Sequence, residues 1–348
     1  MKILFAGGGT LGPVTPLIAV LRRMKERDPK LKAIWVGTPH GPEKEVVAAE
    51  KVPFFAMPVA KLPRYPSLEA LMFPWRYFKA HQVAKELIEK EKPDLIVSVG
   101  GYMCVPLIRE AASRGIPCAI HQLDAEPGIA NRMVAKKCQM VTTSFAYPKP
   151  PFSGVDSEQL PTPCRFADIR PARHTSDRLK IFVLGGGTGA TGLNQLVLSA
   201  LPELISLADI VHLTGKGKAQ EAPQAAGYRQ AEFFNEQQML EAYQNADIVI
   251  SRAGLGTLSE LAALQKATIL VPLPGSQQER NAEAIQDDVF RVDQEGPQAK
   301  QKLLQAIKSL EDNELRKDLG KRLHQSLPTD DGGELAERWL TLVKGKKV

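Results

Sequence analysis

Short runs of apolar, often β-branched residues alternate along the chain with longer segments whose apolar residues recur every three or four positions. Such short runs indicate buried parallel strands, and the periodic segments indicate helices with one face on a sheet. In the first half the strand-like runs are residues 2–6, 32–36, 94–99 and 117–120. In the second half they are residues 179–184, 210–213, 247–250 and 268–271. The alternation predicts an α/β fold with parallel sheets.

A glycine-rich loop follows the first strand of each half. Residues 7–10 and 185–188 both read Gly-Gly-Gly-Thr, and a helical pattern follows each loop. In the second copy, one helix face would carry Leu193, Leu196, Val197 and Leu201. We therefore expect two Rossmann-like domains that face each other across a cleft. The region 147–170 is rich in Pro and Ser and is the expected linker, which places the domains at residues 1–162 and 163–332.

Composition narrows the class of partner. The 348 residues are too many for one ordinary core, and the net charge is +6. Basic residues are spread along the chain without an RNA-type aromatic motif, which disfavours nucleic acid and leaves anionic lipid or an anionic small substrate. The sequence contains no run of eighteen apolar residues, so no transmembrane helix is predicted. The four cysteines form no close pair, as is typical of a reduced cytosolic protein.

The stretch of residues 251–282 carries the strongest chemical pattern. A turn, Ala-Gly-Leu-Gly, follows the strand at 247–250, and Thr257 is the expected N-cap of the next helix. A helix start at the carboxyl edge of a parallel sheet favours phosphate. Glu260 suits a ribose diol, and three amides, Gln277, Gln278 and Asn281, suit sugar hydroxyls. This order predicts a nucleotide-sugar site; the alternative is an ordinary βαβ crossover with a capped helix.

Residues 251–282 resemble the sugar-donor signature of the lipid II-forming N-acetylglucosaminyltransferase family, MurG, and the resemblance covers nearly the whole chain. It implies the two-domain GT-B glycosyltransferase fold, with the terminal helix at 333–348 returning to the first domain. It also implies inverting transfer of N-acetylglucosamine from UDP-GlcNAc to the C4 hydroxyl of the lipid-linked muramyl pentapeptide, lipid I. The product would be lipid II, used in peptidoglycan synthesis.

Matching the family's motifs implies two sets of binding residues. The implied donor-binding residues are Thr10, Gly12, Asn131, Arg165, Gly187, Thr188, Gly189, Phe234, Arg252, Gly254, Thr257, Glu260, Gln277, Gln278 and Asn281. The implied acceptor-binding residues are Gly9, Tyr102 and Asn131. Gly187 and Thr188 replace the family's Ser-Gln, so only backbone contacts to the diphosphate carry over there.

The catalytic base is where the chain departs from the family. Its first glycine loop resembles Gly-Gly-Thr-Gly-Gly-His, but Pro13 replaces the histidine and has no ionisable group. The substitute bases that we expect are Asp124 and Glu126, followed by His121, all after the strand at 117–120. The alternative for the two carboxylates is helix capping.

Residues 58–78 combine apolar and basic side chains. The apolar members include Leu71, Met72, Trp75 and Phe78, and the basic members are Lys61, Arg64, Arg76 and Lys79. This mixture predicts docking on an anionic bilayer, and the alternative is a helix that packs on its own domain. With the lipid acceptor that the resemblance implies, we expect a cytoplasmic protein attached peripherally to the inner face of the plasma membrane. Other cell-wall synthesis proteins are further candidate partners.

No tightly bound cofactor is expected. No Asp-x-Asp motif stands near the expected diphosphate, so no metal ligands are predicted, and a divalent cation would at most stimulate. An NAD(P)-dependent oxidoreductase is an alternative that the missing G-x-G-x-x-G fingerprint argues against. Two alternatives remain within the fold: a transferase for a different acceptor, and a catalytically silent binder of UDP-sugars, which the proline at position 13 motivates.

Overall fold

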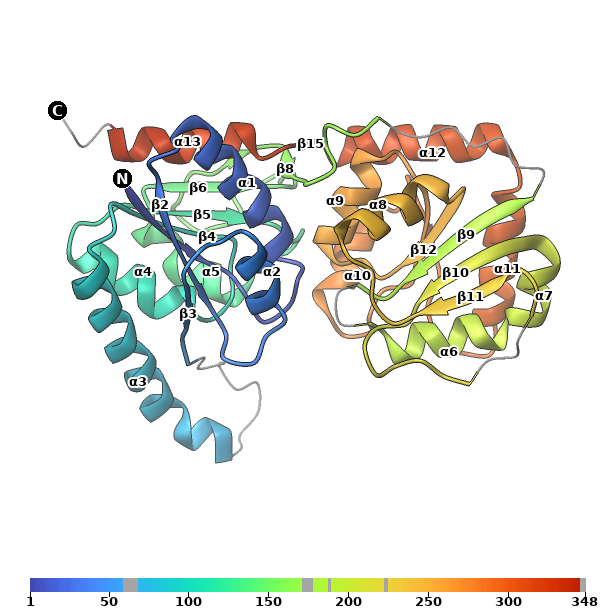
Figure 1. The fold of residues 1–348 in the computed structure, drawn as a ribbon, viewed down its shortest axis with the longest axis horizontal. Helices are drawn as coiled ribbons and strands as arrows, with labels where there is room; N and C mark the ends of the chain where they lie inside the picture. The colour runs from blue at the N-terminus through green and yellow to red at the C-terminus, as the bar shows by residue number, and fades with distance from the viewer. Residues whose placement is uncertain (59–67, 171–177, 187–188, 222–224, 345–348) are drawn as a thin grey trace. The chain divides into compact units, whose positions relative to one another are not determined.

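The structure, a computed structural model, describes residues 1–58, 68–170, 178–186, 189–221 and 225–344. The chain forms two compact units. The first comprises Met1–Pro163 and Asp331–Val348, and the second comprises Cys164–Asp330. Each unit contains a parallel sheet with helices packed on it (Figure 1). The predicted α/β class is confirmed.

The sheet of the first unit has the strand order β3-β2-β1-β4-β5-β6-β7, and its pairings are parallel. Its strands are β1 Lys2–Ala6, β2 Lys32–Gly37, β3 Phe54–Ala56, β4 Leu95–Ser98, β5 Cys118–Gln122, β6 Met140–Thr143 and β7 Glu158–Gln159, and the short β8 Thr162–Pro163 follows. Its helices are α1 Val14–Arg27, α2 Glu43–Ala49, α3 Leu68–Glu91, α4 Cys104–Ser113, α5 Ile129–Val134 and α13 Gly333–Lys344. The terminal helix α13 packs beside α1 (Figure 1), because its apolar face, which includes Leu335 and Trp339, is buried there.

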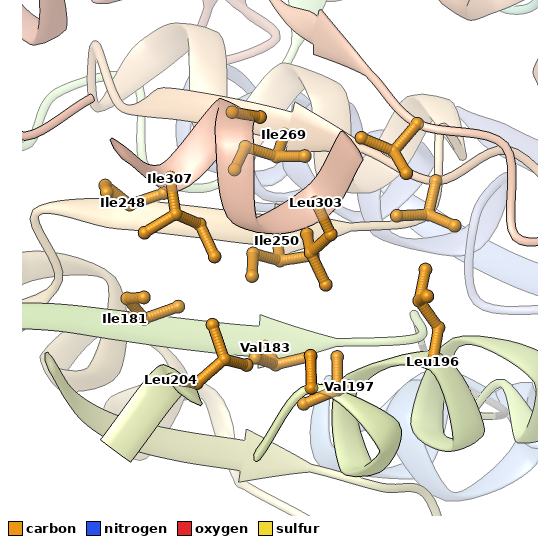
Figure 2. Packing of buried hydrophobic residues seen from close by; sticks show 14 of the residues in the cluster. Ile181, Val183, Leu196, Val197, Leu204, Ile248, Ile250, Ile269, Leu303 and Ile307 are labelled. Atoms are coloured by element: carbon orange, nitrogen blue, oxygen red, sulfur yellow. The ribbon is translucent and has the colours of Figure 1, made fainter. Parts of the chain in front are cut away.

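The sheet of the second unit has the order β11-β10-β9-β12-β13-β14 and is also parallel. Its strands are β9 Leu179–Leu184, β10 Ala208–Leu213, β11 Tyr228–Ala231, β12 Ile248–Ser251, β13 Ala267–Leu270 and β14 Phe290–Arg291, and β15 Thr329–Asp330 follows. Its helices are α6 Thr191–Ser199, α7 Leu201–Leu207, α8 Glu236–Asn245, α9 Leu255–Ala263, α10 Gln277–Ala284, α11 Ala299–Ser309 and α12 Asn313–Ser326. Figure 2 shows one core layer, where Ile248 and Ile250 of β12 meet Leu303 and Ile307 of α11.

The strand order reverses once in each sheet, and the glycine loops lie at these points. In the first unit the reversal is between β1 and β4, and in the second it is between β9 and β12. In open α/β sheets, ligands bind outside the carboxyl ends of the strands at such a point. The topology therefore selects four loops as candidate binding elements: those after β1, β4, β9 and β12.

Two predicted elements differ from the structure. Leu201 was expected on the helix after the second glycine loop, but α6 ends at Ser199 and Leu201 begins α7, where Pro202 occupies a first-turn position. The patch predicted at residues 58–78 contributes to the long helix α3, which contains Pro74 and continues to Glu91. Lys61 and Arg64 of that patch lie outside the described residues.

Candidate functional site

In the first unit, the loops after β1 and β4 approach each other. Gly9 and Thr10 are exposed, and Gly9 has the positive φ of +91° that favours glycine. Gly12 is half-buried beside Thr10. A Cβ on Gly101, in the loop after β4, would lie 3.9 Å from the carbonyl oxygen of Gly8. The loops that carry the predicted acceptor residues Gly9 and Tyr102 therefore lie close together.

Asn131 comes from α5 and reaches the same loops. Its side chain is buried, and its Nδ2 donates to Gln122 Oε1 at 2.7 Å. A Cβ on Gly100 would lie 3.4 Å from both the Oδ1 and Nδ2 atoms of Asn131. Tyr102 is half-buried and lines a small cavity together with Phe73, Tyr77 and Met133. Asn131 thus packs against the loop after β4, and Tyr102 belongs to that loop.

His121 is wrong as a candidate base. The side chain is fully buried in β5, and its two ring nitrogens are hydrogen-bonded to Thr142 Oγ1 at 2.9 Å and Ser144 Oγ at 3.0 Å. Burial lowers the pKa of His121 to about 3. A ring enclosed in this way has no surface from which to accept a substrate's proton, so its role is to pack and to join β5 to β6.

His121 should make the protein acid-sensitive. Its folded pKa of about 3 lies below the usual unfolded value near 6.5, so the unfolded state binds the extra proton as the pH falls. The stabilising effect is therefore present above about pH 6.5 and is lost between that pH and about pH 3. We expect His121→Gln to lose about 2 kcal/mol less of its free energy of unfolding than wild type between pH 7.5 and pH 5, measured with urea. The same substitution at the exposed His40 is the matched control.

Asp124 and Glu126 lie in the loop between β5 and α5. Asp124 is half-buried, whereas Glu126 is exposed and contacts Arg132 NH2 at 3.4 Å. The next helix begins after Gly128, whose N-cap position carries no side-chain hydrogen bond, so neither carboxylate occupies the capping position that was the alternative. Both remain candidate bases, and Asp124 is the more sheltered of the two.

Pro13 occupies the N-cap of α1 without a side-chain cap. A residue that sequence reasoning missed, Glu43, lies against the same glycine loop. It is fully buried, and its Oε1 accepts hydrogen bonds from the Thr38 backbone N at 2.6 Å and from Thr38 Oγ1 at 2.7 Å. A Cβ on Gly8 would collide with this carboxylate, so Glu43 packs directly against the first glycine loop. Glu43 lies in the short helix α2, and no sequence motif near it predicts its contact with the glycine loop.

In the second unit, the start of α9 is open. The N-cap is Gly254, which has no side-chain cap, and a Cβ placed on it would contact nothing within 4 Å. The prediction that Thr257 is the N-cap was wrong, because the helix begins at Leu255 and Thr257 lies in its first turn. Since no side chain satisfies the first backbone N–H groups, they are available to an anionic ligand.

Arg252 and Asn281 join the loops after β12 and β13. Arg252 NH1 donates to the carbonyl oxygens of Val271 and Pro272 at 2.7 and 2.9 Å, and NH2 donates to Gln294 Oε1 at 2.6 Å. In the opposite direction, Asn281 Nδ2 donates to Ala253 O at 3.0 Å. Both side chains are buried. Both were predicted to bind the sugar donor, but in the structure these hydrogen bonds hold the two loops together.

Glu260 and Arg165 form a buried ion pair that the sequence did not predict. Arg165 Nε donates to Glu260 Oε1 at 2.9 Å, and Tyr243 OH donates to Glu260 Oε2 at 2.9 Å. Burial alone would lower the pKa of Arg165, but the charges of Glu260 and Glu236 outweigh it and the pKa is raised. The Glu260 carboxylate has further lone pairs that can accept hydrogen bonds from a ribose. In this structure it also neutralises the charge of Arg165.

The other predicted donor residues have varied surroundings. Gln277 is exposed, and Gln278 Oε1 accepts from the Leu273 backbone N at 3.0 Å. Gly189 has φ +69°, and a Cβ there would collide with the Thr214 carbonyl oxygen, so the loops after β9 and β10 are in contact. Gly187 and Thr188 lie outside the described residues.

Phe234 stacks on Phe182 with ring centroids 6.2 Å apart. It borders a cavity of about 530 Å³, but that cavity also reaches Lys180 and Asn245, near the amino ends of β9 and β12. The cavity thus extends away from the glycine turns. Within the described ranges, no group of three or more His, Cys, Asp or Glu residues is arranged to hold a metal ion.

The matches to family models and to curated relatives indicate the same protein family. Residues 3–143 match the glycosyltransferase family 28 N-terminal domain, and residues 180–327 match the family's C-terminal domain. Over 281 residues, 78% of each chain, the sequence is 37% identical to a protein of Lachnospira eligens named UDP-N-acetylglucosamine–N-acetylmuramyl-(pentapeptide) pyrophosphoryl-undecaprenol N-acetylglucosamine transferase. It is 31% identical over 326 residues, 90% of each chain, to a Clostridium perfringens protein of the same name.

Among solved structures, that of MurG from Acinetobacter baumannii aligns with a TM-score of 0.76 at 23% identity and covers 98% of this chain and 99% of the other. This match supports the two-domain α/β fold of the GT-B glycosyltransferases, which each unit's parallel sheet already indicates.

Proposed function

Because this chain belongs to the MurG family of N-acetylglucosaminyltransferases, we propose that it transfers N-acetylglucosamine from UDP-GlcNAc to the C4 hydroxyl of lipid-linked N-acetylmuramyl pentapeptide. The observation that carries the proposal is 37% identity over 78% of the chain to a relative whose name states this reaction. The transfer is a single displacement with inversion, and its product is the lipid-linked disaccharide.

The second unit binds the sugar donor. The starts of α9 and α6, whose N-caps carry no side-chain hydrogen bond, provide backbone N–H groups for the diphosphate, and these stabilise the charge that develops on UDP as it leaves. Gln277, which is exposed, and Gln278, which is half-buried, are the amides that contact the sugar, because Asn281 is fully buried. A divalent cation acts at most as a stimulant.

The first unit binds the acceptor and supplies the base. Gly9, Tyr102 and Asn131 contact the acceptor, and Asp124 accepts the proton of the attacking hydroxyl, with Glu126 as the second candidate. General-base assistance of this kind typically contributes about 10²–10⁴-fold. Pro13 favours a second candidate function, a silent binder of UDP-sugars, since it supplies no base at its position.

A transfer assay distinguishes these functions. Purified protein is incubated with a short-chain lipid I analogue and UDP-GlcNAc, UDP-glucose or UDP-GalNAc. The proposed function predicts a disaccharide product from UDP-GlcNAc and little from the other two donors. Binding of UDP-GlcNAc without transfer would identify the silent binder, and transfer only to a different acceptor would refute the choice of lipid I.

The membrane contact is made by one face of α3. Leu71, Trp75 and Phe78 follow one another at helical spacing and are 81%, 61% and 59% exposed. Exposed Arg76 and Lys79 adjoin them, with Lys79 Nζ 5.5 Å from the Trp75 ring centroid. Basic and apolar groups together suit an anionic bilayer. None of the described helices is long and apolar enough to cross a membrane. We propose that this face of α3 attaches the protein peripherally to the inner face of the plasma membrane.

We expect the double substitution Leu71→Ser and Trp75→Ser to weaken binding to anionic phospholipid vesicles at least about tenfold, because each side chain loses more than 1 kcal/mol of apolar burial. Co-sedimentation with vesicles measures the effect. Leu273→Ser is the matched control, since Leu273 is 46% exposed but lies in the second unit. Equal binding by both variants would remove α3 from the membrane contact.

A further inference from the structure

Gln122 is the last residue of β5, and both the Nε2 and the Oε1 atoms of its side-chain amide form hydrogen bonds. Its side chain is 2% exposed. Nε2 donates to the carbonyl oxygens of Asp124 at 2.9 Å and Glu126 at 3.2 Å. Oε1 accepts from Asn131 Nδ2 at 2.7 Å and from the Gly128 backbone N at 3.4 Å. One buried side chain therefore contacts the loop 124–128 at three places.

Other side chains hold the same loop by its backbone. Tyr147 OH donates to the Asp124 carbonyl oxygen at 3.1 Å, and Arg132 Nε donates to the Pro127 carbonyl oxygen at 2.9 Å. A loop whose carbonyl oxygens are bound in this way presents its side chains in a fixed direction. The loop carries the two candidate bases, Asp124 and Glu126.

An amide is the group that this position requires. A carboxylate can accept the hydrogen bonds from Asn131 and Gly128, but when ionised it has no proton to donate to the two carbonyl oxygens. Three oxygen acceptors would then face one another in a buried space, which is unfavourable. The loop would have to move away from β5.

We propose that Gln122 is a positioning residue for the transfer reaction, which holds the loop bearing Asp124 and Glu126 in its reactive arrangement and orients the Asn131 amide. The proposal rests on the proposed function. Gln122 touches no reacting atom; it acts through the backbone of the loop and through Asn131.

Gln122→Glu tests the donor half of the amide alone, because the acceptor half is retained. We expect kcat to fall by up to about 100-fold at pH 8, which is the scale of a 1 Å misplacement, while the KM for UDP-GlcNAc stays near the wild-type value. Part of the activity should return as the pH falls, because the protonated carboxyl group can donate one hydrogen bond. Gln122→Met should lose kcat without any return at low pH.

Two further measurements separate positioning from folding and from the proposed function. Hydrogen exchange of the amides of residues 123–126 should be faster in Gln122→Glu, although its thermal midpoint remains above the assay temperature. Gln159→Glu is the matched control, since the exposed Gln159 also donates to a carbonyl oxygen, that of Ser144 at 3.3 Å, outside this loop.

Wild-type kcat and wild-type exchange in Gln122→Glu would overturn the role of Gln122 while leaving the transfer function intact. A loss of kcat with no recovery at low pH and no change in exchange would also overturn it. If the wild-type protein transfers no sugar, the proposed function fails, and the exchange rates still show whether Gln122 holds the loop.

Discussion

Replacing Glu260 with alanine should lower the free energy of unfolding by about 3–5 kcal/mol, the usual result of removing one partner of a buried ion pair. The reason is the surroundings of Arg165, whose side chain is only 14% exposed and whose Nε lies 2.9 Å from Glu260 Oε1. Without Glu260, the guanidinium stays buried with a weaker partner, Glu236 at 3.4 Å, and Tyr243 loses the acceptor of its hydroxyl. Urea denaturation at pH 7.5 measures the change.

An exposed ion pair of the same unit provides the control. Arg280 and Glu283 are 2.8 Å apart, but their side chains are 62% and 54% exposed. Glu283→Ala should cost less than about 1 kcal/mol because solvent screens such pairs. The double variant Arg165→Met, Glu260→Leu should recover much of the loss. A similar small loss at both glutamates would contradict the buried pair.

Replacing Gly189 with alanine should weaken UDP-GlcNAc binding at least about tenfold, or roughly 1.4 kcal/mol. Its φ of +69° is costly for any residue with a Cβ, and the Cβ would also collide with the Thr214 carbonyl oxygen and lie 2.7 Å from Gly215 Cα. The loops after β9 and β10 would have to separate, which displaces the backbone in front of α6. Isothermal titration calorimetry measures the affinity.

Gly186 provides a control that distinguishes backbone strain from the collision of a Cβ with the neighbouring loop. It also has a positive φ, +79°, but a Cβ on it would contact nothing within 4 Å. Gly186→Ala should therefore weaken binding less than Gly189→Ala does. Equal affinities in the two variants would mean that contact between the loops after β9 and β10 has no part in binding the sugar donor.

Local sequence pattern was sufficient for the central strands of both sheets, whereas short strands such as β3, β11 and β14 were not predicted. Runs such as residues 179–184 have the apolar, β-branched character of strands buried on both faces, and β9 spans these residues. Helix ends were harder to predict because they depend on turn geometry. Thr257 has the chemistry of an N-cap, yet the turn at Gly254 starts α9 earlier, and the break after Ser199 divides one expected helix into two.

Candidate site residues were located from motifs, but their partners were not. Arg165 and Glu260 are 95 positions apart in the sequence, and nothing near either residue indicates that they pair. Arg252 and His121 have the chemistry of an anion ligand and of a base, but their burial and their backbone or hydroxyl partners give them structural roles. Gln122 was not predicted as a site residue, because the role of an amide depends on which groups surround it in the fold.

The linkage formed by the purified protein tests the central claim most directly. Proton NMR of the product from UDP-GlcNAc and a short-chain lipid I analogue reports both the anomeric configuration and the acceptor carbon. We predict a β linkage to the C4 oxygen of the muramyl sugar. An α linkage, a different acceptor oxygen, or only hydrolysis of UDP-GlcNAc would contradict it.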